Sequence, residues 1–363
     1  MVQTKKAKNL ILVSLILIAL IFTIYKFSSN ESQNNRSSTS DKQHLSVIRI
    51  AVPDISAGTE SSSGIAIIDY IQLHQLMEKE FEKDHVKIEW HYFKGAGPAI
   101  NEALANKQLD FAFLGDFAAI IGKANNLDTR LILATLRHTK GYLAVQPNQG
   151  YTDLEALRKK RIAVWQGTAG QLAFNQFIQE QGFTEKDFRI INLDPMAAQA
   201  ALLAKRIDAS WSSIDMLALQ QRGLVEIHLS SEQSPTNAGS IEAGLIVRNE
   251  LVKHHPEVVQ RFVKVMLQGS YWVAQPENRD AAIKLIATKT NFPIELLQAG
   301  FENQAFKNIY SPLLDDTFIQ HFKSGTNLAY ESKLIRQKFD VDAWIEPIFV
   351  NQGIKQLNYE GTW

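Results

Sequence analysis

The chain has 363 residues, of which 45% are hydrophobic and 21% charged, and its formal net charge at pH 7 is zero. This length suits two globular lobes, and the even charge balance excludes the basic face that nucleic acid selects. The chain contains no cysteine, which excludes structural disulfides, cysteine-ligated zinc, a cysteine nucleophile and lipid attachment through cysteine.

The N-terminus has the pattern of an export signal. Three lysines within the first eight residues precede an apolar run over residues 10–25, an order that directs the following chain across the inner membrane into the periplasm. Because no small-residue cleavage site follows, residues 1–27 are predicted to remain as a membrane anchor, with a cleaved signal peptide as the alternative. Residues 28–45, rich in Ser, Asn and Gln, are predicted to form a polar linker.

From Val47 the chain alternates short apolar strands with helical stretches, which predicts an α/β fold with largely parallel sheets. Pro98 is placed to open a helix. From Leu251 onward, apolar residues at helical spacing predict packed helices. The predicted strands are 47–52, 86–92, 109–114, 130–136, 142–146 and 161–165.

One passage repeats within the chain. Residues 103–113 are echoed by residues 201–211, so that Ala201 follows Ala103 by 98 residues. In both copies a helix ends near a basic residue and an apolar-Asp pair enters a short strand, as expected if each lobe holds a similar β-α-β unit. The alternative is a common helix-to-strand turn that is used twice.

Several small landmarks follow one another in a characteristic order: residues 95–98, 109–112, 115–116, 153–154, 166–169, 192–195 and 207–209. With them the chain resembles the nitrate, sulfonate and taurine group of ABC substrate-binding proteins, over about residues 46–330. The resemblance implies a type II periplasmic binding protein fold, with two α/β lobes and the ligand between them. It implies crossover strands near 138–141 and 240–244. Residues 46–139 and 242–363 would then build the first lobe, and residues 140–241 the second.

The ligand is expected at the carboxyl ends of the parallel strands, which share one edge of each sheet. The loops there are small and hydroxylated, and helix N-termini with Ser or Thr can hold an anion. Helix capping is the alternative use of the same residues. The candidate loops are 59–64, 95–98, 115–116, 167–170 and 212–213.

Three acids in or near these loops, Asp116, Asp215 and Glu242, could receive an ammonium group, which favours a taurine-like ligand, while the small hydroxylated loops favour a sulfonate. Asp116 could instead stabilise a helix N-terminus, and Trp211 could pack rather than stack on a ligand. The run 210–216 departs from the aromatic stretch that is common in the family, so the pocket wall should differ. The predicted ligand-binding residues are Ser61, Ser62, Ser63, Gly97, Gly115, Asp116, His138, Gln166, Gly167, Thr168, Trp211, Asp215 and Glu242.

The predicted function is the solute-binding component of an ABC importer, a monomer that binds a small organic anion without metal or cofactor and meets a permease and an ATPase. The chain lacks the phosphate-cradling, zinc-protease and serine-hydrolase motifs of enzymes. The fold also serves a pyrimidine-synthesising enzyme of thiamine metabolism, but that family carries a cysteine-rich motif. A membrane-tethered sensor is disfavoured because only nine residues precede the apolar run.

Overall fold

Two five-stranded sheets organise the residues that the structure describes, which are 45–56, 60–302 and 304–363 of a computed structural model. By their contacts these residues form one unit, separate from residues 1–44. The predicted export segment, 1–27, and nearly all of the predicted linker, 28–45, therefore lie outside the described residues. None of the described helices combines the length and apolarity that a membrane crossing needs.

The first sheet has the strand order β2 (Lys87–Phe93), β1 (Val47–Pro53), β3 (Phe111–Gly115), β10 (Ile241–Arg248) and β4 (Thr129–Thr139). β1 pairs in parallel with β2 and β3, whereas β10 runs antiparallel to β3 and β4. Ile48 and Ile50 enter one apolar cluster and Ala51 another, because successive strand residues point to opposite faces. The first sheet is therefore buried on both sides.

Helices cover both faces of the first sheet. The cluster around Ile50 includes residues of α2 (Ala66–Leu73), α3 (Leu76–Phe81), α9 (Asn249–His254), α10 (Pro256–Ala274), α11 (Arg279–Thr290), α12 (Ile294–Gly300), α13 (Phe306–Ile309) and α16 (Ile348–Leu357). The cluster around Ala51 includes residues of α4 (Ala96–Ala105), α5 (Asp116–Ala124), α14 (Asp316–Glu331) and α15 (Val341–Trp344). The predicted packing of the C-terminal helices is confirmed, since Val259, Phe262, Val263 and Met266 are fully buried.

The second sheet has the order β7 (Arg189–Asn192), β6 (Arg161–Val164), β8 (Ala209–Ser212), β5 (Tyr142–Val145) and β9 (Glu226–Ser230). α6 (Ala169–Glu180) packs on one face. α7 (Pro195–Leu203) and α8 (Asp215–Gln221) pack on the other. Short 3-10 helices complete the elements: η1 (Glu82–Asp84), η2 (Glu185–Asp187), η3 (Ser231–Gln233) and η4 (Pro276–Asn278).

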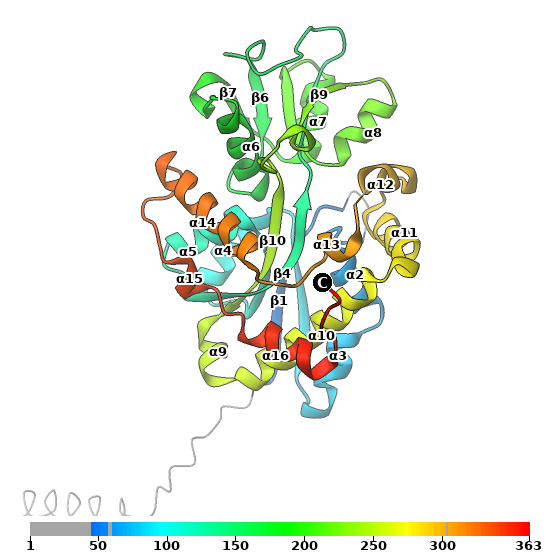
Figure 1. The fold of residues 1–363 in the computed structure, drawn as a ribbon, viewed down its shortest axis with the longest axis vertical. Helices are drawn as coiled ribbons and strands as arrows, with labels where there is room; N and C mark the ends of the chain where they lie inside the picture. The colour runs from blue at the N-terminus through cyan, green and yellow to red at the C-terminus, as the bar shows by residue number, and fades with distance from the viewer. Residues whose placement is uncertain (1–44, 57–59, 303) are drawn as a thin grey trace, which may run out of the picture. The chain divides into compact units, whose positions relative to one another are not determined.

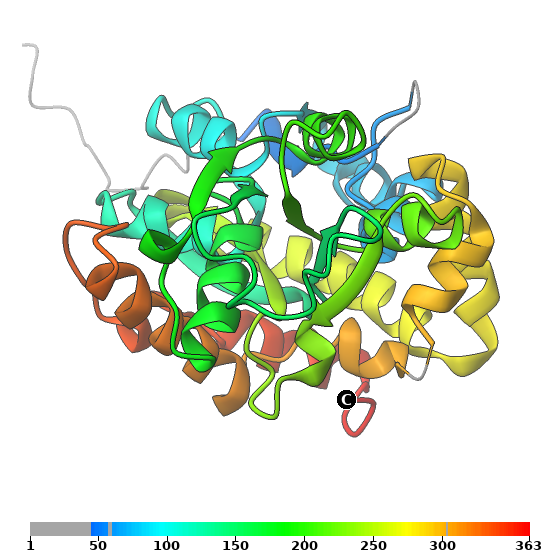
Figure 2. The ribbon, with the colours of Figure 1, turned by 90° about the horizontal axis from the view of Figure 1, so that it is seen from above.

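The chain crosses between the sheets twice. β4 leads into β5 across Lys140 and Gly141, and β9 returns to β10 through η3. Figure 1 shows β4 and β10 side by side below the second sheet, and Figure 2 shows the green middle of the chain flanked by segments from both ends of the colour scale. The predicted fold class, two α/β lobes joined by crossover strands, is confirmed.

The predicted strands are all present. β4 continues past its predicted end at Leu136 to Thr139, where it becomes part of the crossover. α4 begins at Ala96, so Pro98 lies inside the first helical turn and does not open it. Proline is tolerated there because the first backbone N–H groups of a helix have no intrahelical acceptor.

The internal repeat is confirmed as a structural unit. α4 and α7 end at Ala105 and Leu203, and β3 and β8 begin at Phe111 and Ala209, so both boundaries keep the same offset.

The contacts of the repeated aspartates match as well. Asp110 accepts a hydrogen bond from the backbone N of Arg49 at 2.8 Å, and Asp208 accepts one from the backbone N of Arg161 at 2.8 Å. Each aspartate thus ties its strand to the first residues of a parallel neighbour.

Candidate functional site

A cavity of about 240 Å³ lies between the two lobes, beside the crossovers. We call it the central cavity. Its apolar lining consists of Ile55, Leu136, Ile214, Ile241, Ile286, Phe292, Leu297 and Phe301. Its polar lining consists of Ser63, Thr139, Lys140, Tyr142, Ser213, Thr290 and Gln304, and Gly64 and Gly300 complete it.

The loop after β1 supplies the first-lobe wall of the central cavity, and buried acids fix its shape. Asp54 accepts hydrogen bonds from the backbone N and the hydroxyl of Ser56, at 3.0 and 2.7 Å. Burial opposes the ionisation of Asp54, but hydrogen bonds from Ser56 and neighbouring serines outweigh it and hold its pKa below the ordinary value. The loop is therefore arranged around a carboxylate that does not line the central cavity.

Two of the three predicted serines in this loop form hydrogen bonds to buried aspartates. Ser61 hydrogen-bonds Asp54, and the Ser62 hydroxyl donates to Asp69 at 2.9 Å. Ser63 differs, because its hydroxyl accepts a hydrogen bond from the backbone N of Ile65 at 3.2 Å and lines the central cavity. Its own hydrogen is thus available to a ligand.

Asp69 holds this loop from inside the first lobe. It has no exposed surface, and burial raises its pKa to about 7, although Ser62 and Lys289 act in the opposite direction. The Ser62 hydroxyl also accepts a hydrogen bond from the backbone N of Gly64 at 3.0 Å. Asp69 is thereby connected through one hydroxyl to the glycine that lines the cavity.

The second lobe contributes the loop after β8. Ser213 and Ile214 line the central cavity, but Asp215 does not. Its carboxylate accepts hydrogen bonds from the Ser212 hydroxyl at 2.7 Å, the backbone N of Ser213 at 3.1 Å and Gln199 at 3.0 Å. Burial raises the pKa of Asp215 despite these donors. Asp215, the predicted partner of a ligand's ammonium group, therefore already accepts hydrogen bonds from the chain itself at the start of α8.

The glycine loops bring the two lobes into direct contact. A Cβ on Gly115 would lie 2.7 Å from the Ala169 Cβ, and one on Gly167 would lie 3.0 Å from a ring carbon of Pro98. Gly167 has a φ of 75°, which favours glycine. Gly97 is close-packed against Ala118 and near the Gly167 carbonyl. The structure thus places these three predicted glycines at a contact between lobes, outside the lining of the central cavity.

Gln166 and Thr168 lie in the loop that makes this contact, and their hydrogen bonds stay within the second lobe. The Thr168 hydroxyl donates to the Trp165 carbonyl at 2.7 Å, and Thr168 precedes the first residue of α6. The backbone N of Gln166 donates to Asn192 at 2.9 Å. Trp211 lies in the second-lobe core, where its ring stacks on Phe177 with 5.1 Å between centroids.

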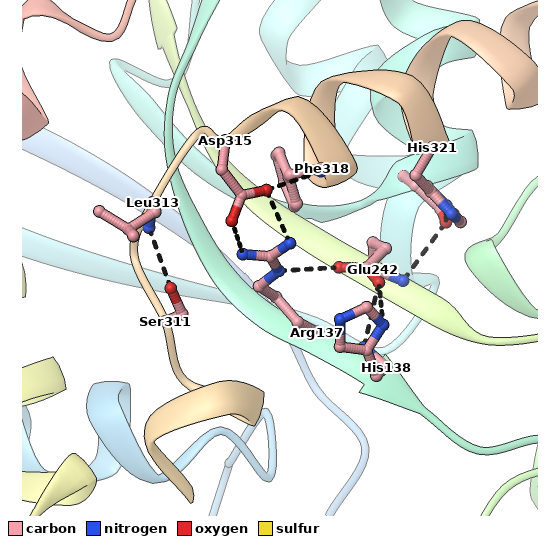
Figure 3. Close-up of polar contacts among 9 residues, drawn as sticks. Arg137, His138, Glu242, Ser311, Leu313, Asp315, Phe318 and His321 are labelled. Carbon is pink, nitrogen blue, oxygen red and sulfur yellow. Dashed lines mark hydrogen bonds and ion pairs between the residues drawn. The ribbon is translucent and has the colours of Figure 1, made fainter. Parts of the chain in front are cut away.

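A buried polar network joins the crossover strands to α14, as Figure 3 shows. Glu242 accepts a hydrogen bond from the backbone N of His138 at 3.1 Å, and the His138 Nδ1 lies 3.1 Å from the same oxygen. Arg137 forms a bidentate pair with Asp315, at 2.7 and 2.9 Å. Since Asp315 also accepts a hydrogen bond from Phe318 and so caps α14, this network fixes the helix to the crossover.

Asp116 belongs to the same network. Its Oδ2 lies 2.6 Å from the Nε2 of His321, and its carboxylate also accepts from the backbone N of Phe117 and of Glu242. Burial raises the pKa of Asp116. Burial lowers the pKa of His321, but the hydrogen bond and charge of Asp116 outweigh it and raise the value. Asp116, His138 and Glu242 therefore belong to one buried network, and none of them lines the central cavity.

Of the predicted ligand-binding residues, the structure brings only Ser63 to the lining of the central cavity. The sequence reasoning missed Thr139, Lys140, Tyr142 and Ile214 as lining residues. Their signal was their position, since Thr139 and Lys140 stand in the predicted crossover, Tyr142 directly follows it, and Ile214 follows the predicted loop 212–213. Lys140 also forms an ion pair with Glu232.

The sequence model of the NMT1/THI5-like proteins matches residues 85–279, which is more than half of the chain. The chain belongs to the NMT1/THI5-like family. A Bacillus subtilis (strain 168) member with the provisional name of an aliphatic sulfonates-binding protein is 25% identical over 350 residues, covering 96% of this chain and 98% of that one.

Solved structures agree with this placement. The periplasmic sulfonate-binding protein SsuA of Methylobacillus flagellatus KT, assigned provisionally to a sulfonate ABC transporter, is 30% identical, with a TM-score of 0.77 over 88% of this chain and 97% of that one. The desulfurization enzyme DSZB shares the fold at 15% identity, with a TM-score of 0.63 over 86% and 99%. The fold alone therefore does not separate a receptor from an enzyme.

Proposed function

We propose that this protein is the solute-binding component of an ABC importer and that it binds an organic sulfonate in the central cavity. The observation that carries the proposal is a cavity that both lobes bound. Most of its surface is apolar, and the Ser63 hydroxyl and the N-terminus of α2 lie at one side. A ligand there would touch both lobes and favour their closure. The names of the relatives that cover nearly the whole chain support the same substrate class.

The sulfonate group fits best beside Ser63 and Gly64. These residues precede Ile65, the N-cap residue of α2, whose first backbone N–H groups and partial positive charge favour an anion. Lys140 lines the same cavity and is the one cationic side chain among its described lining residues. The opposite wall is less suitable, because the Asp215 carboxylate already accepts from the Ser213 backbone N.

The rest of the ligand should be apolar. Ile214 and Ile241 face the cavity from the second lobe and the crossover, and Phe301 from α12's end. No Asp or Glu is among the lining residues that the structure describes, so the ammonium group of taurine would have no charged partner. We therefore favour an alkane- or arenesulfonate over the amino-sulfonate that the acids in the sequence had favoured.

Binding rather than catalysis fits the groups that line the cavity. A hydroxyl nucleophile needs a neighbouring base, and the described lining includes no histidine or carboxylate. Two carboxylates lie just behind it, Asp215 at 3.4 Å from the Ser213 hydroxyl and Glu232 at 3.4 Å from the Tyr142 hydroxyl. Asp215 already accepts from Ser212 at 2.7 Å, and Glu232 is paired with Lys140. His138 lies on the other side of the crossover, against Glu242. The importer role further implies a permease and an ATPase as partners, and a receptor that acts as a monomer in the periplasm.

The first experiment is a thermal-shift and calorimetry screen with 1-hexanesulfonate, benzenesulfonate, taurine, nitrate and the neutral 1-hexanol. Ligand at a hundred times its dissociation constant should stabilise the protein by about 2.7 kcal/mol. We expect the two apolar sulfonates to bind more tightly than taurine and hexanol not to bind. Binding of hexanol alone, or chemical turnover of a sulfonate in a mass-spectrometric assay, would contradict the proposed function.

Export can be tested separately. We propose that residues 1–27 carry the protein across the inner membrane and stay attached, because no small-residue cleavage site follows the apolar run. The intact mass of the native protein should then include this segment, and the protein should fractionate with membranes. A mature N-terminus between residues 26 and 45 would show instead that a signal peptide is removed.

A further inference from the structure

One side chain of the second lobe packs against the first lobe at the central cavity. Beyond the crossover residues, the second lobe contributes Tyr142, Ser213 and Ile214 to the described lining, and of these Ile214 alone is aliphatic. Ile214 packs against the apolar cluster around Ile50, which belongs to the first lobe. Figure 1 shows α12 of the first lobe directly below α8 of the second, and the two helices contact each other. The wall that Ile214 forms is therefore complete only while the lobes are together.

Gly300, the last residue of α12, receives the Ile214 side chain. A Cβ on Gly300 would lie 2.6 Å from the Ile214 Cγ1, well inside van der Waals contact. Ile214 thus fills the space that a side chain at position 300 would take. Gly300 is not among the glycines with a positive φ, so its backbone does not itself require glycine. The missing side chain matters for the contact between the lobes.

Hydrogen bonds hold the backbone on both sides of Ile214. The Asp215 carboxylate accepts from the Ser212 hydroxyl at 2.7 Å and from the backbone N of Ser213 at 3.1 Å. The backbone N of Leu217 donates to the Ile214 carbonyl at 3.1 Å, at the start of α8. A β-branched side chain also has few accessible rotamers. Ile214 therefore forms a fixed wall of the cavity.

The first-lobe groups beside this contact are apolar as well. Leu297 lies on α12 before Gly300, Phe301 follows it, and both line the central cavity. A ligand chain that ends at this wall would gain apolar contacts from both lobes. A longer chain would displace Ile214 from Gly300 and so separate the lobes, because the loop holds the Ile214 backbone in place. Ligand length and lobe closure are therefore coupled at this contact.

We infer that Ile214, held against Gly300, sets the largest apolar group that the central cavity accepts when the lobes are closed. The inference rests on the proposed binding of a sulfonate in this cavity, and it adds the residue that limits the length of the ligand's hydrocarbon chain. The cavity volume of about 240 Å³ agrees with such a limit. It lies below the roughly 300–1,000 Å³ that is typical of sites for drug-sized ligands.

The test compares the linear alkanesulfonates from 1-butanesulfonate to 1-decanesulfonate, by calorimetric titration of the full-length protein and of Ile214→Ala. Each methylene that becomes buried strengthens binding by about fourfold. In the wild type we expect the affinity to rise with chain length and then to stop rising within this series. Ile214→Ala removes three carbons from the wall, so the affinity should keep rising for about two further methylenes. The ratio of the affinities for 1-decanesulfonate and 1-butanesulfonate should then increase at least tenfold.

The matched control is Ile227→Ala, which removes the same three carbons elsewhere in the second lobe. Ile227 is partly buried against the apolar cluster around Ala198 and does not line the central cavity. This variant should keep the chain-length profile of the wild type. Ile214→Val, which removes a single carbon, should give an intermediate profile, and thermal melts of all variants should report intact folding.

The contact can also be tested from the first lobe, with Gly300→Ala. The added methyl group competes with Ile214 for the same space, so 1-hexanesulfonate should bind severalfold more weakly. Ile214→Ala in the same chain should recover most of this loss, because the two changes act on one contact.

Two results would overturn the inference while leaving the proposed sulfonate binding intact. One is the same chain-length profile in the wild type and in Ile214→Ala. The other is a loss in Gly300→Ala that Ile214→Ala does not relieve. If no alkanesulfonate of any length binds to the wild type or to Ile214→Ala, the proposed function fails, and the inference fails with it.

Discussion

Ser63 is the hydroxyl that the first lobe offers to a ligand. It accepts from the backbone N of Ile65 and lines the central cavity directly before α2. Its neighbour Ser61 instead hydrogen-bonds the buried Asp54. The two serines therefore have different roles although the sequence presents them as one hydroxylated run.

We predict that Ser63→Ala lowers the affinity for 1-hexanesulfonate by about tenfold or more, since a hydrogen bond to a charged group contributes about 1.5–3 kcal/mol. Ser61→Ala is the matched control and should change the affinity little. Calorimetric titration of both variants measures the difference. Equal losses would place the sulfonate away from Ser63.

Asp69 should make stability depend on pH. Its pKa rises to about 7 in the folded protein, from an ordinary value of 3.8, because burial disfavours the charged form. The folded state therefore binds a proton that the unfolded state releases. The stabilisation from this group is full at low pH and is lost as the pH rises to about 7.

Asp69→Asn should remove this loss. We expect the free energy of unfolding of the variant to rise relative to the wild type between pH 4 and pH 7, by up to about 4 kcal/mol. Urea denaturation at several pH values measures the difference. If the difference in unfolding free energy between the variant and the wild type stays constant over this range, burial does not raise the pKa of Asp69.

At the scale of elements, the contact of β3 with α6 couples the lobes. Gly115 ends β3, and a Cβ there would lie 2.7 Å from the Ala169 Cβ, which cannot move aside by rotation. Its φ of −65° allows alanine, so the substitution acts on the contact and not on the local backbone.

Gly115→Ala should therefore push the lobes apart and weaken ligand binding, at least severalfold, while each lobe keeps its own core. Gly170→Ala is the control, because its added Cβ would meet only the Thr168 hydroxyl oxygen, at 3.5 Å. Calorimetry measures affinity, and small-angle scattering measures the spread of the lobes. Unchanged affinity in Gly115→Ala would mean that this contact does not limit closure.

The elements themselves were largely predictable. Short apolar runs predicted β1 to β6 because a buried strand needs apolar side chains along its length. The repeat at residues 103–113 and 201–211 predicted two matching helix-to-strand units, and Asp110 and Asp208 hold both in the same way. Only the ends were displaced, as at Pro98, where sequence alone does not fix the first turn.

At the scale of the whole molecule, two crossovers and a cavity between lobes imply hinge motion. Ser63 and Ser213 line the central cavity from the first and second lobe. Because the chain contains no cysteine, the double variant Ser63→Cys, Ser213→Cys carries a single pair of cysteines, and their cross-linking reports how close the two lobes are.

A bound ligand that touches both lobes should favour the closed state, so we predict faster cross-linking of this pair by a short bis-maleimide when 1-hexanesulfonate is present. Gel mobility under denaturing conditions measures the rate. Cross-linking that is equally fast with and without ligand would show that the lobes do not move on binding. The single variants, which cannot cross-link within the chain, are the control.

The sequence by itself determined the class of fold, the strands and helices, and the family, because these depend on local periodicity and on many small landmarks read in order. Which polar residues face a ligand was decided only by the tertiary structure. Asp116 and Asp215 looked available in the sequence, but His321, 205 residues from Asp116, and the hydroxyl of Ser212 occupy them. The hydrogen-bonding demand of a buried carboxylate is met by whichever donors the fold brings near, and for Asp116 two of these donors, His321 and the backbone N of Glu242, are far away along the chain.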